Sequence, residues 1–261
     1  MMFISSRDNA LLKTLRRLSQ DSTAYRREQR IWLEGDHLCR AALQRGVQPE
    51  QAVFAQSAWD QPDPVWAGVQ SQAVVMPDAL FASISQLESP ARMGFVLRLP
   101  DAAAIEPATP TVVLDRLQDA GNVGAILRCA AAFGFRQVLA LTGTAALWSP
   151  KVLRAGMGAH FGLRLREGLD ATCVDALALP VLTTSSHQGP LLHELSQSGA
   201  LPAACAWVLG HEGQGVSPAL MQRADLQVRI AQPGGEESLN VAAAAAICLH
   251  ASACMGLSSS G

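Results

Sequence analysis

The sequence lacks the features that mark a membrane protein, a secreted protein or a zinc protein. No apolar run in its 261 residues is long enough to span a membrane, because charged or polar residues interrupt each candidate. The N-terminus, MMFISSRDNALLKTLRR, has no long apolar stretch followed by a cleavage site, so we expect no secretory signal. The histidines show neither an HExxH motif nor zinc-like spacing, which argues against a bound metal. A hydrophobic content of 49% with 16% charged residues indicates a soluble globular protein instead.

Cysteine pairs with redox or metal-binding spacing are also missing. None of the six cysteines belongs to a CxxC pair, and most have apolar neighbours in the sequence. This pattern favours reduced, buried thiols and therefore a cytoplasmic protein. The sequence also contains no GxSxG elbow, no P-loop and no glycine-rich motif of the common S-adenosylmethionine-binding fold, which argues against those three classes of enzyme.

Lysine is scarce, with 2 lysines against 18 arginines, and the formal net charge is −2. The overall charge argues weakly against a nucleic-acid partner, but the charges are unevenly spread. Between Arg7 and Arg30 there are seven basic and three acidic residues, and 151–166 contains four basic residues and no acid. Arginine suits phosphate contacts and base stacking, and an ordinary solvated helix face is the alternative interpretation. The candidate nucleic-acid contacts are Arg7, Lys13, Arg16, Arg17, Arg26 and Arg27.

The chain divides at a segment rich in proline and alanine. Residues 99–110, LPDAAAIEPATP, contain few large apolar side chains and indicate a linker. We therefore predict a first domain over 1–98 and a second over 111–261. In the first domain the patterns predict helices at NALLKTLRRLSQ, DHLCRAALQRG and DALFASIS, and strands at RIWLEG, QAVFAQ, QAVVMP and MGFVLRL. This mixture predicts a small α/β sandwich.

The second domain alternates strands and helices more regularly. Strands are predicted over 111–117, 137–143, 160–166, 180–186, 205–210 and 226–231, and helices over 122–133, 150–158, 171–178, 217–223 and 238–254. Ser149-Pro150 and Ser217-Pro218 each place an N-cap residue before a proline at the first helical position. Such alternation predicts a mainly parallel sheet covered by helices on both faces. Because ligands of these sheets bind beyond the carboxyl ends of the strands, the loops after the strands are expected to carry the function.

Two of these loops combine glycines with isolated polar side chains. In LDRLQDAGNVGAILRCAAAFGF (114–135), Asn122 can cap a helix, and Arg128 follows among small and apolar residues, where it needs an anion as its partner. A structural ion pair is the alternative for Arg128. In VLGHEGQGVSPAL (208–220), Gly210 ends a strand, and Glu212 carries the only charge of a tight glycine loop.

A third loop opens the last helix. In GGEESLNVAAAAAICLHA (234–251), Ser238 or Asn240 can cap the helix that the five alanines begin. A surface helix needs a polar face, and this helix has almost none. We therefore expect it to be buried, with another segment very close to its small side chains.

Together the three loops resemble the motifs of the SpoU/TrmH-type RNA 2′-O-ribose methyltransferases of the SPOUT superfamily. The first motif is matched by Asn122, Gly124 and Arg128. The second is matched by Gly210, Glu212, Gly213 and Gly215. The third is matched by Ile230, Gly234, Ser238, Leu239, Asn240 and Val241. The motifs occur in the family order and cover 111–254, and two loop positions depart from the pattern: Ala120 and Ala231 stand where the family usually has proline.

The resemblance implies a fold, a cofactor and an assembly. The implied fold is α/β, with a mainly parallel C-terminal sheet that contains a deep trefoil knot. The first domain is similar to the small L30e-like α/β domain that binds the RNA substrate in this family, through ISSRDNALLKTLRRL and WLEGDHLCRAAL. The implied partners are RNA and a second copy of the chain, with Cys248 and Cys254 at the homodimer interface. The implied cofactor is S-adenosylmethionine, held by backbone groups at Gly210, Ile230 and Leu239, with Thr184 or Ser185 nearby.

The resemblance also implies roles for the motif side chains. The implied catalytic residues are Arg128, Asn122, Glu212, Ser238 and Asn240. The family proposal makes the arginine a base, but an arginine in a protein is effectively always protonated. Arg128 is therefore expected to hold the RNA phosphate and to stabilise the developing alkoxide. The implied reaction is methylation of a ribose 2′-OH in ribosomal RNA, and the alternatives are a tRNA 2′-O-methyltransferase and a non-catalytic RNA-binding or ribosome-assembly factor.

Overall fold

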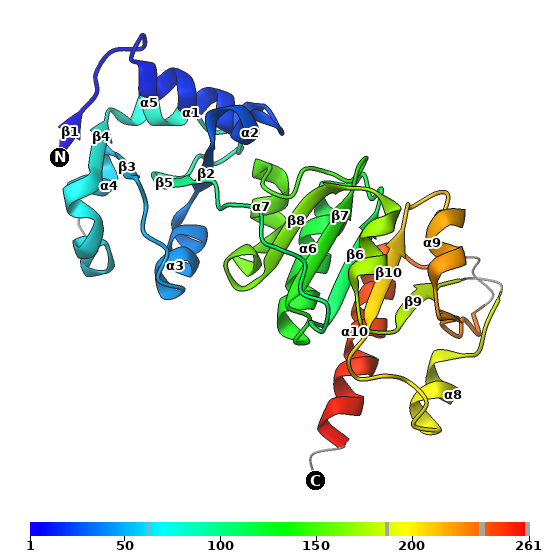
Figure 1. Ribbon diagram of the computed structural model, residues 1–261. Helices are drawn as coiled ribbons and strands as arrows, with labels where there is room; N and C mark the ends of the chain where they lie inside the picture. Colours follow the sequence, from blue (N-terminus) through cyan, green and yellow to red (C-terminus); the bar gives the residue numbers. More distant parts are fainter. Residues whose placement is uncertain (62, 186–187, 235–237, 259–261) are drawn as a thin grey trace. The chain divides into compact units, whose positions relative to one another are not determined.

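The computed structural model describes the chain except for residue 62 and residues 186–187, 235–237 and 259–261 (Figure 1). The chain forms two compact units. The first contains Met1–Asp101 and Trp148–Phe161, and the second contains Ala102–Leu147 and Gly162–Gly261. Segment 148–161 thus groups with the first unit, although it lies in the middle of the second domain as the sequence predicts it.

The first unit is built on a five-stranded mixed sheet with the strand order β1-β4-β3-β5-β2. The strands are β1 (Met2–Phe3), β2 (Arg30–Glu34), β3 (Gln51–Ala55), β4 (Ala73–Met76) and β5 (Met93–Arg98). Strands β1, β4 and β3 run parallel, and β5 is antiparallel to its two neighbours, β3 and β2. Four of the five strands lie where the apolar runs of the sequence predict them, and β1 was not foreseen.

Helices pack on both faces of this first sheet. They are α1 (Ala10–Gln20), α2 (Ala24–Glu28), α3 (Asp36–Gln44), α4 (Gln56–Trp59), the 3-10 helix η1 (Pro64–Gln72), α5 (Asp78–Ala82) and α7 (Pro150–Gly156). On one face, Cys39 of α3 and Trp66 of η1 belong to the same core as Ile31 and Phe95. Trp32 points to the opposite face, because successive strand residues alternate, and its ring lies 6.1 Å from that of Phe81 in α5.

The second unit contains a six-stranded sheet with the order β11-β9-β10-β6-β7-β8. Its strands are β6 (Thr111–Asp115), β7 (Gln137–Leu141), β8 (Arg164–Leu169), β9 (Val181–Thr184), β10 (Ala206–Gly210) and β11 (Leu226–Val228). Every neighbouring pair is parallel, which confirms the predicted parallel sheet. The strand predicted over 160–166 is misplaced: the 3-10 helix η2 (Ala159–Gly162) occupies the first part, and β8 begins at Arg164.

The second sheet is also covered on two faces (Figure 1). Its helices are α6 (Ala120–Ala132), the 3-10 helix η3 (Ala171–Ala176), α8 (Leu192–Gln197), α9 (Pro218–Arg223) and α10 (Val241–Ser258). Val174 of η3 and Leu220 of α9 share a core with Val113 and Val208 of the sheet. Helix α10 packs against β10, α6 and α8. The buried indole Nε1 of Trp207 in β10 donates to Ser252 Oγ of α10 at 3.0 Å.

Helix α10 is buried on one face only. Ala245, Cys248 and Leu249 are fully buried, at the spacing of one helical face, whereas Ala243 and Ile247 are exposed. The expectation that the whole helix is buried is therefore wrong for the single chain. Its small residues let one face lie against β10 and α6, and they leave the opposite face apolar and exposed.

Candidate functional site

A cavity of about 630 Å³ lies at the carboxyl ends of the second sheet's strands. Its wall is formed by the end of β9, the end of β10 with the loop that follows, residues 230 and 232 after β11, and the segment 238–244 that leads into α10. Three separate strand ends thus contribute to one cavity. This is the place where a doubly covered parallel sheet binds its ligands.

The residues that the sequence implies as cofactor contacts all line this cavity, namely Gly210, Ile230, Leu239 and Thr184. Gly210 is buried at the end of β10, and a Cβ atom there would lie 2.2 Å from backbone atoms of the returning loop, so only glycine fits. Leu239 is 40% exposed and lines the cavity, so its apolar side chain is available to a ligand.

The loop after β10 is closed by its own backbone. The N–H of His211 donates to Gly215 O at 3.1 Å, and the N–H of Gly215 donates to His211 O at 2.8 Å. The side chain of His211 completes the turn, because its Nδ1 accepts from the N–H groups of Gly213 and Gln214 at 3.0 and 3.3 Å. Gly215 adopts φ +69°, a conformation that favours glycine. The loop therefore holds a fixed backbone shape around the cavity.

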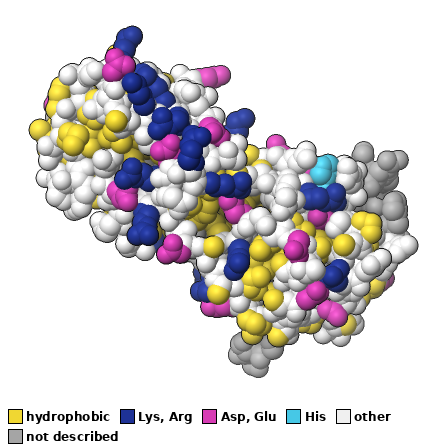
Figure 2. Space-filling model, turned by 45° about the horizontal axis from the view of Figure 1, so that its top comes forward, with side chains coloured by type: hydrophobic (Ala, Val, Ile, Leu, Met, Phe, Trp, Pro, Cys, Tyr) yellow, Lys and Arg dark blue, Asp and Glu magenta, His cyan; other side chains and the backbone are white. Residues whose placement is uncertain are grey.

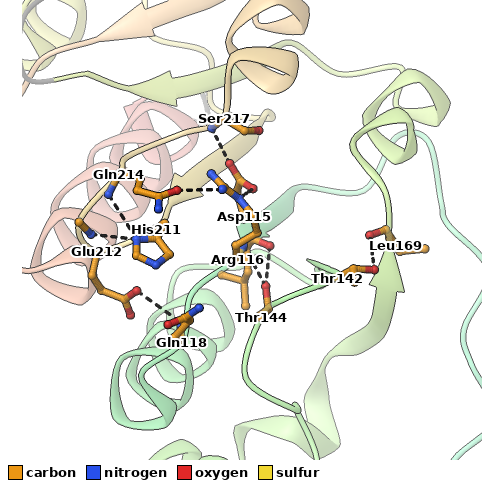
Figure 3. A network of polar contacts seen from close by, with 12 residues as sticks. Asp115, Arg116, Gln118, Thr142, Thr144, Leu169, His211, Glu212, Gln214 and Ser217 are labelled. Carbon is orange, nitrogen blue, oxygen red and sulfur yellow. Dashed lines mark hydrogen bonds and ion pairs between the residues drawn. The ribbon is translucent and has the colours of Figure 1, made fainter.

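Glu212 joins this loop to the loop after β6 (Figure 3). Its carboxylate accepts from the N–H groups of Gln118 and Asp119 at 3.3 and 3.1 Å, and from Asn122 Nδ2 at 3.3 Å. Partial burial works to raise the pKa of Glu212, but these hydrogen bonds and one from its own backbone N–H outweigh it and lower the pKa. The ionised carboxylate is thus the form that holds the two loops together.

Asn122 continues the contact to the third loop. Asn240 Nδ2 donates to Asn122 Oδ1 at 3.0 Å, so Glu212, Asn122 and Asn240 form one chain of side-chain hydrogen bonds. Asn240 also caps α10, because its Oδ1 accepts from the N–H groups of Ala242 and Ala243 at 2.9 and 3.3 Å. Its predicted capping role is confirmed.

The predicted cap of α6 is wrong. The helix begins at Ala120, and Asp119 is the N-cap residue, whose Oδ1 accepts from the N–H of Asn122 at 2.7 Å. Asn122 therefore lies inside the first turn. Because Asp119 satisfies the helix end, the side chain of Asn122 is available to connect the loops.

Arg128 and Ser238 differ from the other predicted catalytic residues. Arg128 is exposed on α6, lies outside the cavity wall, and makes no ion pair or hydrogen bond with any residue that the structure describes. The alternative of a structural ion pair thus finds no partner within the described residues. Ser238 is exposed and lines the cavity.

Sequence reasoning missed two residues at the end of β6, Asp115 and Arg116. Asp115 is only 1% exposed, and its carboxylate accepts from the N–H of Ser217 at 2.6 Å and from Arg116 Nε at 2.9 Å. Arg116 adopts φ 61°, and its Nη1 donates to Gln214 Oε1 at 3.1 Å (Figure 3). The available signal was the Asp that ends the apolar run TVVLD.

The contact between Ser217 and Asp115 bears on the N-cap predicted for α9. Ser217 occupies the N-cap position before Pro218, but its side chain makes no capping hydrogen bond, and its backbone N–H is the group that contacts Asp115. Ser149, by contrast, caps α7 as predicted, with its Oγ accepting from the N–H of Val152 at 3.4 Å. Ser217 thus serves to anchor the loop after β10 to β6.

The predicted RNA contacts lie in the first unit, where Figure 2 shows Lys and Arg side chains spread over the visible face among acidic ones. Arg17 and Arg27 share Glu28, with N–O distances of 2.9 and 3.7 Å, and Lys13 lies 3.3 Å from Asp8. The other three, Arg7, Arg16 and Arg26, are exposed or half-buried. Exposed ion pairs of this kind are weak, so they leave these side chains able to exchange partners for phosphate groups.

Two kinds of site are missing from the described part of the chain. It contains no group of three His, Cys, Asp or Glu side chains that could hold a metal ion. None of its described helices is long and apolar enough to cross a membrane.

Comparison with known proteins shows the family to which the chain is similar. The model of the SpoU rRNA Methylase family matches residues 109–250. The chain is 30% identical to the 23S rRNA (guanosine(2553)-2'-O)-methyltransferase RlmP of Bacillus subtilis over 84% of its own length and 86% of that protein. It is 31% identical to a tRNA/rRNA methyltransferase of Synechocystis over 95% of its length and 92% of the relative.

Solved structures agree with the sequence relatives. A crystal structure of an RNA 2'-O ribose methyltransferase superposes with a TM-score of 0.79 at 29% identity, and the match covers 98% of this chain and all of that one. The AviRb methyltransferase of Streptomyces viridochromogenes, crystallised with the cofactor AdoMet, has a TM-score of 0.82 at 19% identity over 96% of this chain and 99% of its own, which shows the shared fold.

Proposed function

The chain belongs to the SpoU rRNA methylase family, and from this membership we propose which RNA it modifies and what each site residue does. It is an RNA 2′-O-methyltransferase that uses S-adenosylmethionine. We propose that the substrate is ribosomal RNA. The support is the Bacillus relative, which is named for 23S rRNA and matches most of both chains. The observation that carries the methyltransferase function is the cavity lined by the second and third loops, to which Asn122 of the first loop is joined by hydrogen bonds.

The cavity suits S-adenosylmethionine in size and lining. Its volume of about 630 Å³ lies within the range of small-molecule sites, roughly 300–1,000 Å³. A Cβ at Gly210 would collide with the loop, so the backbone there is kept bare, and the buried Oε1 of Gln232 in the wall has no hydrogen-bond partner among the described residues. We propose that backbone groups at Gly210, Ile230 and Leu239 hold the cofactor, with Thr184 beside them. When bound, the cofactor supplies the methyl group.

The protein side chains then have two tasks. Arg128 binds the RNA phosphate and stabilises the negative charge that develops on the ribose oxygen, because its positively charged guanidinium is exposed and forms no ion pair with a described residue. Glu212, Asn122 and Asn240 hold the three loops in one arrangement through their hydrogen bonds. Ser238, exposed in the cavity wall, orients the target nucleotide.

The first unit is assigned to RNA binding, as an L30e-like domain over 1–98 that a linker over 99–110 joins to the methyltransferase domain over 111–261. Its support is the cluster of exposed basic side chains on α1 and α2 together with a mixed sheet covered on both faces. The enzyme is assigned to the cytoplasm, where ribosomal RNA is available in a bacterium-type cell.

The segment after β11 is assigned to a trefoil knot. Two contacts support this threading. Arg229 N–H donates to Pro190 O at 2.9 Å and Arg229 O accepts from Leu192 N–H at 2.8 Å, so the chain runs beside 190–192 after β11. It then reaches Asn122 through Asn240 and passes the loop after β10 at the cavity. An experimental structure traced through 226–244 tests the threading.

The exposed face of α10 is assigned to a homodimer interface. Ile247 and Leu257 are 41% and 77% exposed, although both are large and apolar. One expectation for this interface is wrong, because Cys248 is fully buried within its own chain and cannot be an interface thiol. Cys254 is half-buried on the same helix and stays a candidate.

The experiment that tests the function is transfer of labelled methyl from S-adenosylmethionine to total RNA that lacks the modification, followed by separation of ribosomal and transfer RNA. We expect label in ribosomal RNA with the wild type and none with Arg128→Ala. Label confined to tRNA would replace the proposed substrate by the alternative one. Cofactor binding without label in either fraction would favour the RNA-binding or assembly factor.

A further inference from the structure

One polar side chain in the cavity wall has no role in the site described so far. Gln232 follows Ile230 by two residues, is half-buried, and lines the cavity. Its Oε1 is buried and has no hydrogen-bond partner among the described residues. No hydrogen bond joins this amide, through its oxygen or its nitrogen, to another residue that the structure describes.

A buried amide oxygen without a partner is costly, and folded proteins seldom keep one without a use. The amide can turn toward a ligand without breaking a hydrogen bond to any described residue. A primary amide carries an acceptor next to a donor, and this pair matches the edge of adenine, where an exocyclic amine lies beside a ring nitrogen. Glutamine and asparagine recognise adenine in nucleic acids through this pairing.

The rest of the wall suits a flat ring beside this amide. Ile230, Leu239, Val241 and Ala244 line the same cavity and offer apolar surface. The carboxylate of Glu212, also in the wall, is occupied by hydrogen bonds from the loop after β6. Among the described residues of this wall, Gln232 is the one whose side chain has a buried polar atom without a hydrogen-bond partner.

We propose that the Gln232 amide recognises the adenine edge of the cofactor, with Oε1 accepting from the exocyclic amine and Nε2 donating to the adjacent ring nitrogen. This rests on the proposed function only in that the cavity binds S-adenosylmethionine. The proposed cofactor contacts then comprise backbone groups at positions 210, 230 and 239 and one side chain that distinguishes adenine from other bases. Gln232 is thus a specificity residue for the cofactor, in a site otherwise built from backbone and apolar contacts.

The test measures binding and not turnover, by calorimetry with S-adenosylhomocysteine and with an analogue that has hydrogen in place of the adenine amine. We expect Gln232→Met to weaken S-adenosylhomocysteine binding about threefold to tenfold, the effect of one or two net hydrogen bonds. The wild type should prefer the amine-bearing ligand, and Gln232→Met should lose most of that preference. Gln232→Glu keeps the acceptor oxygen and should retain it.

A matched control exists in Gln227, whose Oε1 is also buried and unpartnered among the described residues but which is not part of the cavity wall. Gln227→Met should leave both dissociation constants unchanged. Without ligand, both methionine variants should melt at or above the wild-type temperature, because each removes an unpaired buried oxygen. Equal affinities and an unchanged preference for the amine in a folded Gln232→Met would overturn the proposal. A wild type that binds neither ligand would instead reject the proposed function.

Discussion

The polar side chains of the site mainly form hydrogen bonds that connect one loop to another. Glu212 contacts backbone and side chain of the loop after β6, and Asn122 passes the connection to Asn240 at the start of α10. Glu212 is the one charged member of this chain, and its carboxylate accepts three of the hydrogen bonds that join the loops. Substitution of Glu212 should therefore weaken the connection between the loop after β10 and the loop after β6.

The hydrogen bonds to Glu212 predict how the stability of the fold depends on pH. The folded-state pKa of Glu212 is lowered by the hydrogen bonds it accepts, so its contribution to stability is present above the ordinary glutamate pKa and is lost as pH falls through the lowered value. We expect Glu212→Gln to cost about 0.5–1 kcal/mol at pH 7, a small value because the group is exposed. Urea denaturation at several pH values measures this. The difference from wild type should vanish in acid and be absent for Glu88→Gln, which makes none of these contacts; a difference that grows in acid would contradict the assigned sign.

Arg128 gives a prediction in turnover. Loss of a positive donor that stabilises developing charge lowers the rate by about 10²–10³-fold or more. Arg128→Ala should therefore abolish detectable methyl transfer while S-adenosylhomocysteine binds as in wild type, since Arg128 lies outside the cavity wall. Arg136→Ala, an exposed arginine shortly after the same helix, is the matched control and should stay active. Loss of ligand binding in Arg128→Ala would make this arginine structural.

The role of a single residue could be predicted from the sequence where that residue type has few structural roles in its context. Asn240 at the start of an apolar helix predicts a cap, and Gly210 before a turn predicts close backbone contact; the structure contains both. Asp119 and Asn122 are both common N-cap residues and lie only three positions apart, so the sequence did not show which of them begins α6. Asp115 and Arg116 escaped notice because their partners, Ser217 and Gln214, lie about a hundred residues away in the sequence.

Among the elements, the strands of the second sheet were the easiest to predict. Strands β6, β7 and β10 are short, largely apolar runs that are fully buried, such as TVVLD and QVLAL, whereas β8 and β11 are mostly half-buried. The strand predicted over 160–166 was misplaced because its apolar residues follow the end of a helix. Met157 and Gly158 both adopt positive φ there, and the chain forms a 3-10 helix before β8 pairs with β7. Short 3-10 helices have no apolar period of their own, so η1 and η3 were missed or assigned as longer α-helices.

The contact between α10 and β10 gives a prediction in stability. Ser252 is fully buried, accepts from the indole of Trp207, and lies 3.6 Å from Cys205 Sγ. Ser252→Ala leaves a buried N–H without its partner, which costs about 1–3 kcal/mol. Chemical denaturation should show this loss, whereas Ser71→Ala, at an exposed site, should change stability by less than about 0.5 kcal/mol. A neutral Ser252→Ala would mean that the indole finds another acceptor.

At the scale of the whole molecule, the exposed apolar face of α10 predicts the oligomeric state. Ile247→Glu places a charge on this face, and burying an unpaired charge in an interface is strongly unfavourable. Light scattering coupled to size exclusion should show a dimer for wild type and a monomer for the variant. Val65→Glu alters a comparably exposed apolar residue of the first unit, at 39% exposure, and should leave the dimer intact. A wild type that is monomeric at micromolar concentration would contradict the assignment of this face.

The first unit predicts the salt dependence of RNA binding. Each phosphate contact that is lost should reduce the slope of log affinity against log salt by about 0.7–1. Arg26→Ala and Arg27→Ala, both exposed at the end of α2, should each weaken RNA binding and flatten this slope. Arg223→Ala, which removes an arginine paired with Asp175 in the second unit, is the control. Unchanged slopes for the first two variants would place the RNA elsewhere.

The division into two units was predictable from composition, but its details were not. The Pro- and Ala-rich segment after Leu99 marks the main change of unit. Segment 148–161 carries no such mark. It groups with the first unit because Leu153 belongs to the same core as Ile31 and Trp66, and a single sequence does not reveal a packing partner more than eighty residues away.

The strand order of the second sheet bears on how the protein is made. Strand β10 lies between β6 and β9, yet the ribosome synthesises it after both of them. At about 5–20 residues per second, the nascent chain waits for seconds between the end of β9 and the completion of β10. During that interval β6 presents an unpaired apolar edge, and β9 has no neighbour in the sheet that it finally occupies. We infer that this interval is when the growing polypeptide is most exposed to wrong strand pairing and most in need of a chaperone.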